Sequence, residues 1–264
     1  MRTVLSWLVG LSALALAACA SSSPDLPAPP VHANGGALWK IIDTQCLPGL
    51  KDRHDPAPCE AVSLDGGQAH GFVLLKDRDG VAQYLLMPTA KITGIEDPLI
   101  LAPDAQNYFA RAWEARGSVE TKLGKPLPRD EMTVAINSLY GRSQDQLHLH
   151  IDCIDPQTKA ELKAIAPQIG PRWTSQEFSL HGQPYHVRRL TEAELAINPF
   201  FLLRDQMPGA SAYMGAWTLA LIGDTDAQGR PDFLLIAARA DPAHGHKASA
   251  EDLQDHACAV AKAG

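Results

Sequence analysis

The sequence predicts an α+β fold with a mostly antiparallel sheet and packed helices. Two pairs of apolar segments are separated by short turn-forming stretches, as in β-hairpins: 70–76 with 81–88, and 213–222 with 231–239. Apolar residues at helical spacing predict a long helix over 104–123. Strand pairs joined by short turns, with helices interspersed, favour an antiparallel sheet.

The elements between these strands follow from local patterns. An apolar side on residues 37–45 predicts a short helix. The first hairpin turns at 77–80 and the second at the glycine-containing loop 223–229, and the long helix is expected to begin at Asp104 and stop at Gly124. The remaining expected segments are strands at 132–138 and within 176–190, a helix at 158–166, a short helix from a capping box at Thr191 to Pro199, and a last helix from Ser249.

Composition and charge exclude some classes of partner. The chain has 264 residues, of which 45% are hydrophobic and 20% charged, which suits one globular domain with appendages. The formal net charge is −7 and no basic run is present, so nucleic-acid binding is not expected. A phosphate ligand remains compatible with this charge, because a local cluster such as Arg142 with Arg188 and Arg189 could bind one.

The amino terminus has the features of an export signal. Arg2 precedes an apolar run at 4–15 that is too short to span a membrane, and the sequence Leu-Ala-Ala-Cys follows at 16–19. This ending resembles the bacterial lipobox, so residues 1–18 are predicted to form a lipoprotein signal peptide and Cys19 to carry lipid. An uncleaved signal anchor is the alternative.

A tether and a folded domain are expected after the signal. Residues 19–36 are rich in Pro, Ser and Gly without periodicity, which is typical of a tether, and 37–264 remain for the domain. A lipid on the new amino terminus would attach the domain to a membrane without a spanning helix. We therefore expect a protein of the bacterial cell envelope with its domain in the periplasm.

Cysteine usage agrees with export. Four cysteines remain after Cys19, and an even number in an exported chain favours two disulfides. Four cysteines allow three pairings. Cys46 and Cys59 close a short loop and form the natural local pair, which leaves Cys153 for Cys258. Four free thiols are the alternative.

Residues 146–154 carry the strongest chemical signal. Polar and apolar residues alternate strictly, which predicts a half-buried strand. One face would carry Gln146, His148, His150 and Asp152, with the two imidazoles about 7 Å apart. Three interpretations of this row stay open: solvent-facing histidines, two ligands of a metal site, or a nucleophilic histidine with a positioned neighbour.

A polar loop just upstream adds candidate phosphate contacts. Asn137, Gly141, Arg142 and Ser143 offer an amide, a backbone freed by glycine, a guanidinium and a hydroxyl. An ordinary hairpin loop is the alternative. Lys91 is a further candidate phosphate contact, although a solvated lysine fits the sequence equally well.

The row Gln146-x-His148-x-His150 resembles the histidine triad motif, His-x-His-x-His, with glutamine in place of the first histidine. Within that superfamily, further blocks over residues 38–258 resemble the CDP-diacylglycerol pyrophosphatases. These blocks are Gln-Tyr-Leu-Leu-Met-Pro at 83–88, Ala-Ile-Asn-Ser at 135–138, His-Leu-His-Ile-Asp-Cys-Ile at 148–154, Arg-Arg-Leu-Thr-Glu at 188–192 and Ala-Ser-Ala-Glu-Asp-Leu-Gln-Asp-His-Ala-Cys at 248–258.

The resemblance implies a histidine-triad-like fold and hydrolysis of CDP-diacylglycerol to CMP and phosphatidate, without cofactor or metal. It assigns the nucleophile to His148, which would form a cytidylyl-histidine intermediate that water then hydrolyses. His150, Gln146, Ser143 and Asn137 would hold the phosphate oxygens and the leaving group. Glutamine at 146 can only form hydrogen bonds, but phosphatidate, with a second pKa of about 6, can leave with little help.

Two other functions remain open on the sequence alone. One is a metal-binding lipoprotein that uses His148 and His150. The other is a module that binds a nucleotide or lipid without turnover. The partners expected for the main prediction are CDP-diacylglycerol or a related nucleotide diphosphate, and a membrane through the lipid anchor.

Overall fold

Within residues 26–262, which the computed structural model describes, nine strands form one sheet whose neighbouring strands are all antiparallel. The strands are β1 (Ala61–Ser63), β2 (Phe72–Lys76), β3 (Tyr84–Pro88), β4 (Met132–Ile136), β5 (Leu149–Cys153), β6 (Phe178–Leu180), β7 (Gln183–Thr191), β8 (Trp217–Thr225) and β9 (Pro231–Arg239). Their order across the sheet is β1-β2-β3-β5-β4-β8-β9-β7-β6. The predicted α+β class with an antiparallel sheet is confirmed.

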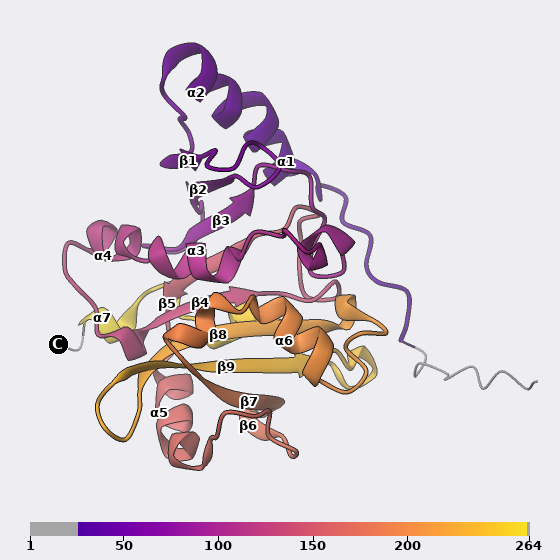
Figure 1. Ribbon diagram of the computed structural model, residues 1–264, viewed down its shortest axis with the longest axis vertical. Coiled ribbons are helices and arrows are strands. Elements are labelled where there is room, and N and C mark those ends of the chain that lie inside the picture. Colours follow the sequence, from indigo (N-terminus) through magenta and orange to yellow (C-terminus); the bar gives the residue numbers. More distant parts are fainter. Residues whose placement is uncertain (1–25, 263–264) are drawn as a thin grey trace, which may run out of the picture.

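Helices lie at both ends of the sheet and over its faces (Figure 1). The α-helices are α1 (Ala37–Ile41), α2 (Leu47–Arg53), α3 (Tyr108–Glu114), α4 (Gly117–Leu123), α5 (Pro156–Ile165), α6 (Pro199–Gln206) and α7 (Ala259–Lys262). A π-helical turn, η1 (Ile42–Cys46), joins α1 to α2. The 3-10 helices are η2 (Pro98–Leu101), η3 (Arg129–Glu131), η4 (Ala166–Gln168), η5 (Ala193–Ala196), η6 (Met214–Ala216), η7 (Pro242–His244) and η8 (Ala250–Leu253).

The sheet is covered on both faces, and the cover on one face has two separate parts. On the first face, a large apolar core packs α3, α4 and α6 against the strands, with Phe109 in edge contact with Phe200. On the opposite face, the α1–α2 helix covers β2 and β3 through Ile42. Helices α5 and η8 cover β7, β8 and β9 through Leu162 and Leu253. Strand β5 lies between these two parts of the cover.

The single helix expected over 104–123 is wrong. The chain forms two helices, α3 and α4, and Gly117 begins the second. Glycine has a low helix propensity, which weakens a continuous helix at this point. Helix α3 also begins later than Asp104, because the side chain of Asn107 accepts a hydrogen bond from the N–H of Ala110 at 3.1 Å and caps the helix there.

The last helix is also shorter than expected. From Ser249 the chain forms only η8, and it then leaves the helix at Gln254 to make a bridge with Ile154. Helix α7 starts after Cys258, which has a positive φ of 48° and is bonded to Cys153. Tertiary pairing to the sheet therefore overrides the local helical pattern.

The capping box at Thr191 and Glu194 is present, with each residue's side chain bonded to the other's backbone N–H, and it caps the short η5. Pro199 was expected to end a helix, but it begins α6. A proline lacks the backbone N–H that the first helical turn leaves unused, so the same residue fits either position.

Both predicted disulfides, Cys46–Cys59 and Cys153–Cys258, are formed. The first joins the end of the π turn to the segment before β1. The second joins the end of β5 to the carboxyl-terminal segment, across a sequence separation of 105 residues.

Residues 1–25, and with them the predicted signal peptide and Cys19, lie outside the described part of the chain. The tether residues that are described pack against the loop before β5. The carbonyl of Pro27 accepts from Tyr140 Oη at 3.0 Å, and the carbonyl of Gly35 accepts from the N–H of Asp145 at 2.6 Å. None of the helices in residues 26–262 is long and apolar enough to cross a membrane.

Candidate active site

The two histidines of the motif lie at β5, on the face of the sheet where the two parts of the cover are separated. His150 on β5 is opposite Leu85 of β3 and Ala135 of β4, which belong to separate apolar clusters. His148 immediately precedes β5. The two histidines are only 7% and 4% exposed, so the interpretation as solvent-facing histidines is wrong. The sequence alone predicted a half-buried strand because it does not show the cover from distant segments.

The ring of His148 is held in one orientation. Its Nδ1 lies 2.6 Å from the backbone carbonyl oxygen of Gln146 and must donate its proton there. The lone pair is then on Nε2, which has no hydrogen-bond partner among residues 26–262. Burial lowers the pKa of His148, although the Gln146 carbonyl and the charge of Glu251 oppose this effect. His148 is therefore a neutral imidazole with a free nitrogen, as a nucleophile requires.

His150 lies against His148 with ring centroids 4.9 Å apart, nearly edge to face. Its Nδ1 is 3.0 Å from Gln83 Nε2 and 3.3 Å from Glu251 Oε1. Its Nε2 is buried without a partner in the described chain. Burial lowers the pKa of His150, while the Glu251 carboxylate acts in the opposite direction. The resting ring is neutral, and Nδ1 accepts from Gln83.

His150 lies next to a network of ion pairs formed by His256, Asp152 and Glu251. His256 Nδ1 donates to Asp152 Oδ2 at 2.7 Å, and its Nε2 lies 3.4 Å from Glu251 Oε1. The hydrogen bonds to Asp152 and Glu251 raise the pKa of His256 to about 10, so it is an imidazolium. Burial works to raise the pKa of Glu251, but His256, His150 and two amide donors outweigh it and hold that pKa well below its usual range.

His148, His150 and Glu251 lie at a cavity of about 400 Å³. Its polar wall contains Asn137, Ser143, Gln144, His148, His150 and Glu251. Its apolar wall contains Leu38 and Ile41 of α1 with Pro58, Leu75 and Leu85, and Lys76 and Arg78 lie at the turn between β2 and β3. A cavity of this kind, mostly apolar with a few convergent polar groups, is typical of a small-molecule site.

Comparison with known proteins gives the family. The family model for CDP-diacylglycerol pyrophosphatase matches residues 33–262. A curated protein from Yersinia pestis named CDP-diacylglycerol pyrophosphatase is 46% identical over 228 residues, which cover 86% of this chain and 85% of that protein. The chain belongs to the CDP-diacylglycerol pyrophosphatase family.

In this member of the CDP-diacylglycerol pyrophosphatase family, the predicted site residues fall into two groups. His148, His150, Asn137 and Ser143 line the cavity. The amide of Asn137 is occupied, because its Nδ2 donates to Glu251 Oε2 at 2.9 Å and its Oδ1 accepts from the Glu251 N–H at 3.1 Å. Asn137 therefore orients Glu251.

The other predicted contacts lie outside the lining of the cavity. Gln146 is fully buried, and its Nε2 donates to the carbonyls of Pro88 and Ala90, each at 3.1 Å. Arg142 is committed to two carboxylates, Glu96 and Asp145. Lys91 is exposed.

Three residues of the site, Gln83, Glu251 and His256, were not predicted from the sequence. All three fell within the recognised blocks at 83–88 and 248–258 but had no neighbouring chemical pattern. The pairing of β3 with β5 and the disulfide at Cys258 bring them to His150.

The metal interpretation gains no third ligand from the described residues. In residues 26–262, three potential ligand atoms within 4.8 Å of one another occur only in Asp152, Cys153 and Cys258, and both cysteines are in the disulfide. His148 and His150 are not part of such a group.

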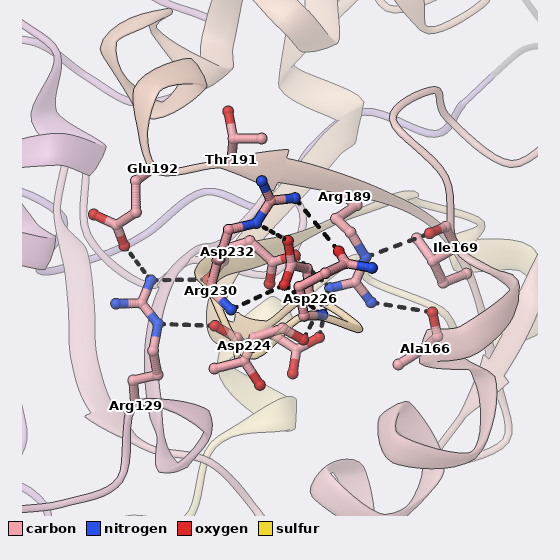
Figure 2. A network of polar contacts seen from close by, with 12 residues as sticks. Arg129, Ala166, Ile169, Arg189, Thr191, Glu192, Asp224, Asp226, Arg230 and Asp232 are labelled. Atoms are coloured by element: carbon pink, nitrogen blue, oxygen red, sulfur yellow. Dashed lines mark hydrogen bonds and ion pairs between the residues drawn. The ribbon is translucent and has the colours of Figure 1, made fainter.

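A larger cavity, about 730 Å³, lies beside the β8–β9 turn and contains a charged network (Figure 2). Arg189 donates to Asp224 Oδ2 at 2.9 Å and to Asp232 Oδ2 at 2.6 Å. Arg230 donates to Asp226 at 2.6 Å. Arg129 pairs with Glu192 and with the carbonyls of Asp224 and Asp232. These guanidinium groups join β7, β8 and β9, and no histidine lines the cavity.

Proposed function

We propose that this protein hydrolyses the pyrophosphate bond of CDP-diacylglycerol, giving CMP and phosphatidate through a cytidylyl intermediate on His148. The observation that carries the proposal is the orientation of His148, whose Nδ1–H is bound to a backbone carbonyl 2.6 Å away while Nε2 is free at the cavity. Membership of the family supplies the substrate class.

In the first step, His148 Nε2 attacks the phosphorus nearest cytidine, and the bond from that phosphorus to the bridging oxygen breaks. Phosphatidate leaves. The proton on Nδ1 stays on the ring, so the phosphorylated imidazole carries a positive charge that the Gln146 carbonyl stabilises. A covalent intermediate divides one difficult displacement into two easier ones.

In the second step, water attacks the same phosphorus and the P–N bond breaks. His148 leaves as a neutral imidazole, because Nδ1 has kept its proton throughout. CMP is then released, and the resting state of the ring is restored without a proton on Nε2.

Two features of the cavity support an anionic, lipid-linked substrate. Lys76 lines the cavity beside Asp77 and Asp79, and its Nζ donates to the carbonyls of Asp77 at 2.7 Å and Gly80 at 3.0 Å, which leaves one of its three N–H donors for a phosphate oxygen. Leu38 and Ile41 lie on the apolar wall, where the glycerol end of the substrate would meet them. A volume of about 400 Å³ suits a headgroup and leaves the acyl chains outside.

We also propose that lipid on Cys19 holds the domain at a membrane surface in the periplasm. The lipobox-like sequence and the two disulfides support this location, because structural disulfides persist in oxidising compartments.

The test is turnover of CDP-diacylglycerol labelled at the phosphorus nearest cytidine, in detergent micelles with a chelator present. The parent should release CMP, and alkaline denaturation during turnover should trap label on His148. His148→Ala should lower kcat on the order of 10⁴-fold or more, since no other described group is placed to attack. His244→Ala, a change of an exposed histidine away from the cavity, should match the parent. Full CMP release by His148→Ala would reject the proposal.

A further inference from the structure

Glu251 reaches the cavity from a distant part of the chain and meets His150 at Nδ1. Its Oε1 lies 3.3 Å from His150 Nδ1, and its Oε2 accepts from Asn137 Nδ2 at 2.9 Å. Its own N–H is held by Asn137 Oδ1. These contacts fix both the backbone and the carboxylate of Glu251 relative to the ring.

The ion-pair network next to His150 carries a net negative charge. Asp152 and Glu251 provide two carboxylates, and His256 between them provides one positive charge. The titratable groups that act on the pKa of His150 are Glu251, His148 and His256. This net negative charge repels a diphosphate in the cavity unless a proton is taken up between the network and the diphosphate. The ring of His150 lies at that position.

His150 can exchange one partner for another when it is protonated. In the neutral ring Nδ1 accepts from Gln83 Nε2, and in the imidazolium the same atom donates to Glu251 Oε1. Nε2, which has no partner in the described chain, would then carry the second proton. Gln83 Nε2 also donates to Glu251 Oε1 at 3.3 Å, so it keeps a partner when His150 Nδ1 becomes a donor.

We propose that Glu251 and His150 form an acid–base pair in which His150 passes one proton to the departing phosphatidate and takes one back from the attacking water. This inference rests on the proposed function. His150 is the group that exchanges the proton, and Glu251 is a positioning residue that stabilises the imidazolium through Nδ1–H, as the carboxylate of a catalytic triad does.

The proton balance closes over the two steps. As the bond to the bridging oxygen breaks, the His150 Nε2 proton moves to that oxygen of phosphatidate, and His150 becomes neutral with Nδ1–H on Glu251. As the water oxygen bonds to phosphorus and the bond to His148 Nε2 breaks, one water proton moves to His150 Nε2. The sum is one water consumed for one CMP and one phosphatidate.

The pair accounts for glutamine at the first motif position. Gln146 is bound to two backbone carbonyls and cannot exchange a proton. Phosphatidate leaves with little help, but water, with a pKa of about 15.7 in bulk, needs a base as it attacks. His150 backed by Glu251 supplies that base without a histidine at position 146.

The test compares Glu251→Gln with the parent in kcat, KM and the pH dependence of kcat. The change removes one charge with little change in shape. We expect kcat to fall about 100-fold, within the range for loss of general acid–base catalysis, with little change in KM. The alkaline limb of the profile should move to lower pH, because the imidazolium of His150 loses its counter-charge. Asp252→Asn, a change of the next residue in η8 that does not line the cavity, should keep the parental profile.

Two further variants keep the test decisive. Glu251→Asp retains the charge and should return the alkaline limb toward its parental position, which a purely structural role would not require. In a double-mutant cycle, Glu251→Gln should add almost nothing to the loss caused by His150→Asn, because Glu251 acts through that ring. A parental pH profile in Glu251→Gln, or losses that multiply in the double variant, would overturn the pair. A parent that releases no CMP and traps no label would instead reject the proposed function itself.

Discussion

Charged residues of this site depend on the ion pairs that they form, and His256 shows this most directly. It bridges Asp152 and Glu251, and its two hydrogen bonds raise its pKa to about 10. Since this lies above the ordinary histidine value of 6.5, the imidazolium stabilises the folded state fully below pH 6.5, and the contribution is lost as pH rises toward 10.

His256→Gln should therefore destabilise the protein most at low pH. We expect the difference in the free energy of unfolding between parent and variant to shrink steadily from pH 6.5 to pH 10. Urea unfolding at a series of pH values measures this difference directly. A difference that stays constant across the window would mean that His256 is not the bridging cation.

The sequence predicted the site residues only as far as neighbouring residues could show them. His148 and His150 stand out because alternation on one strand places them together. Glu251 and His256 could not be assigned, because only the pairing of distant segments brings them to β5. Gln146 follows the same alternation, but its side chain turns to the carbonyls of Pro88 and Ala90, a contact that no local pattern predicts.

At the scale of elements, the carboxyl-terminal segment 247–258 is attached to the sheet by backbone hydrogen bonds and a disulfide. The Ser138 N–H donates to the carbonyl of Ala248 at 3.0 Å, and the Asp255 N–H donates to the carbonyl of Cys153 at 3.0 Å. The Cys153–Cys258 disulfide closes this attachment. Glu251 and His256 lie between these contacts, so their positions depend on the segment staying in place.

Replacing both Cys153 and Cys258 by serine should lower stability and activity together. In the chain-entropy model, a loop of about 100 residues corresponds to about 4.7 kcal/mol of stabilisation. We expect kcat to fall even at temperatures where the variant is folded, because Glu251 and His256 lose a covalent attachment. The matched control is Cys46→Ser with Cys59→Ser, which opens a bridge with a sequence separation of 13 and leaves the attachment of Glu251 and His256 intact. Equal losses of kcat in the two variants would contradict this role.

The elements that the sequence predicted well are those whose signal is local. The hairpin of β8 and β9 lies where apolar runs flank a glycine-containing turn, and β9 has the bounds expected from the pattern. The predicted helix at 37–45 continues through the π turn and α2, and α6 was missed because a proline reads both as an end and as a start. The sheet order, in which β5 lies between β3 and β4, was not predicted, because it depends on long-range pairing.

At the scale of the whole molecule, the proposed lipid anchor at Cys19 is close along the chain to residues that pack beside the cavity. Only residues 20–25 separate Cys19 from the first described residue, Leu26, and an extended chain spans at most about 3.6 Å per residue. From Pro27 to Gly35 the chain packs on the loop before β5, and Gln144 of that loop lines the cavity. A lipid on Cys19 would therefore keep the cavity within a short distance of the bilayer that holds the substrate.

We expect mature protein from the cell envelope to begin at a diacylglyceryl-modified Cys19, which mass spectrometry of the amino-terminal peptide would show. The lipid should raise the rate on CDP-diacylglycerol in vesicles, where anchoring increases the local concentration of enzyme at the substrate surface. It should have little effect on substrate dispersed in detergent, because the cavity itself is unchanged. Cys19→Ser, which cannot be lipidated, should therefore lose rate on vesicles and keep it in micelles.

The detergent assay is the internal control for this comparison, because it reports the cavity without the anchor. An intact Met1 terminus on membrane-extracted protein would reject lipidation at Cys19. Equal rates of lipidated parent and Cys19→Ser on vesicles would show that the anchor does not bring the cavity to its substrate, even if the lipid is present. The two outcomes separate the modification from the role proposed for it.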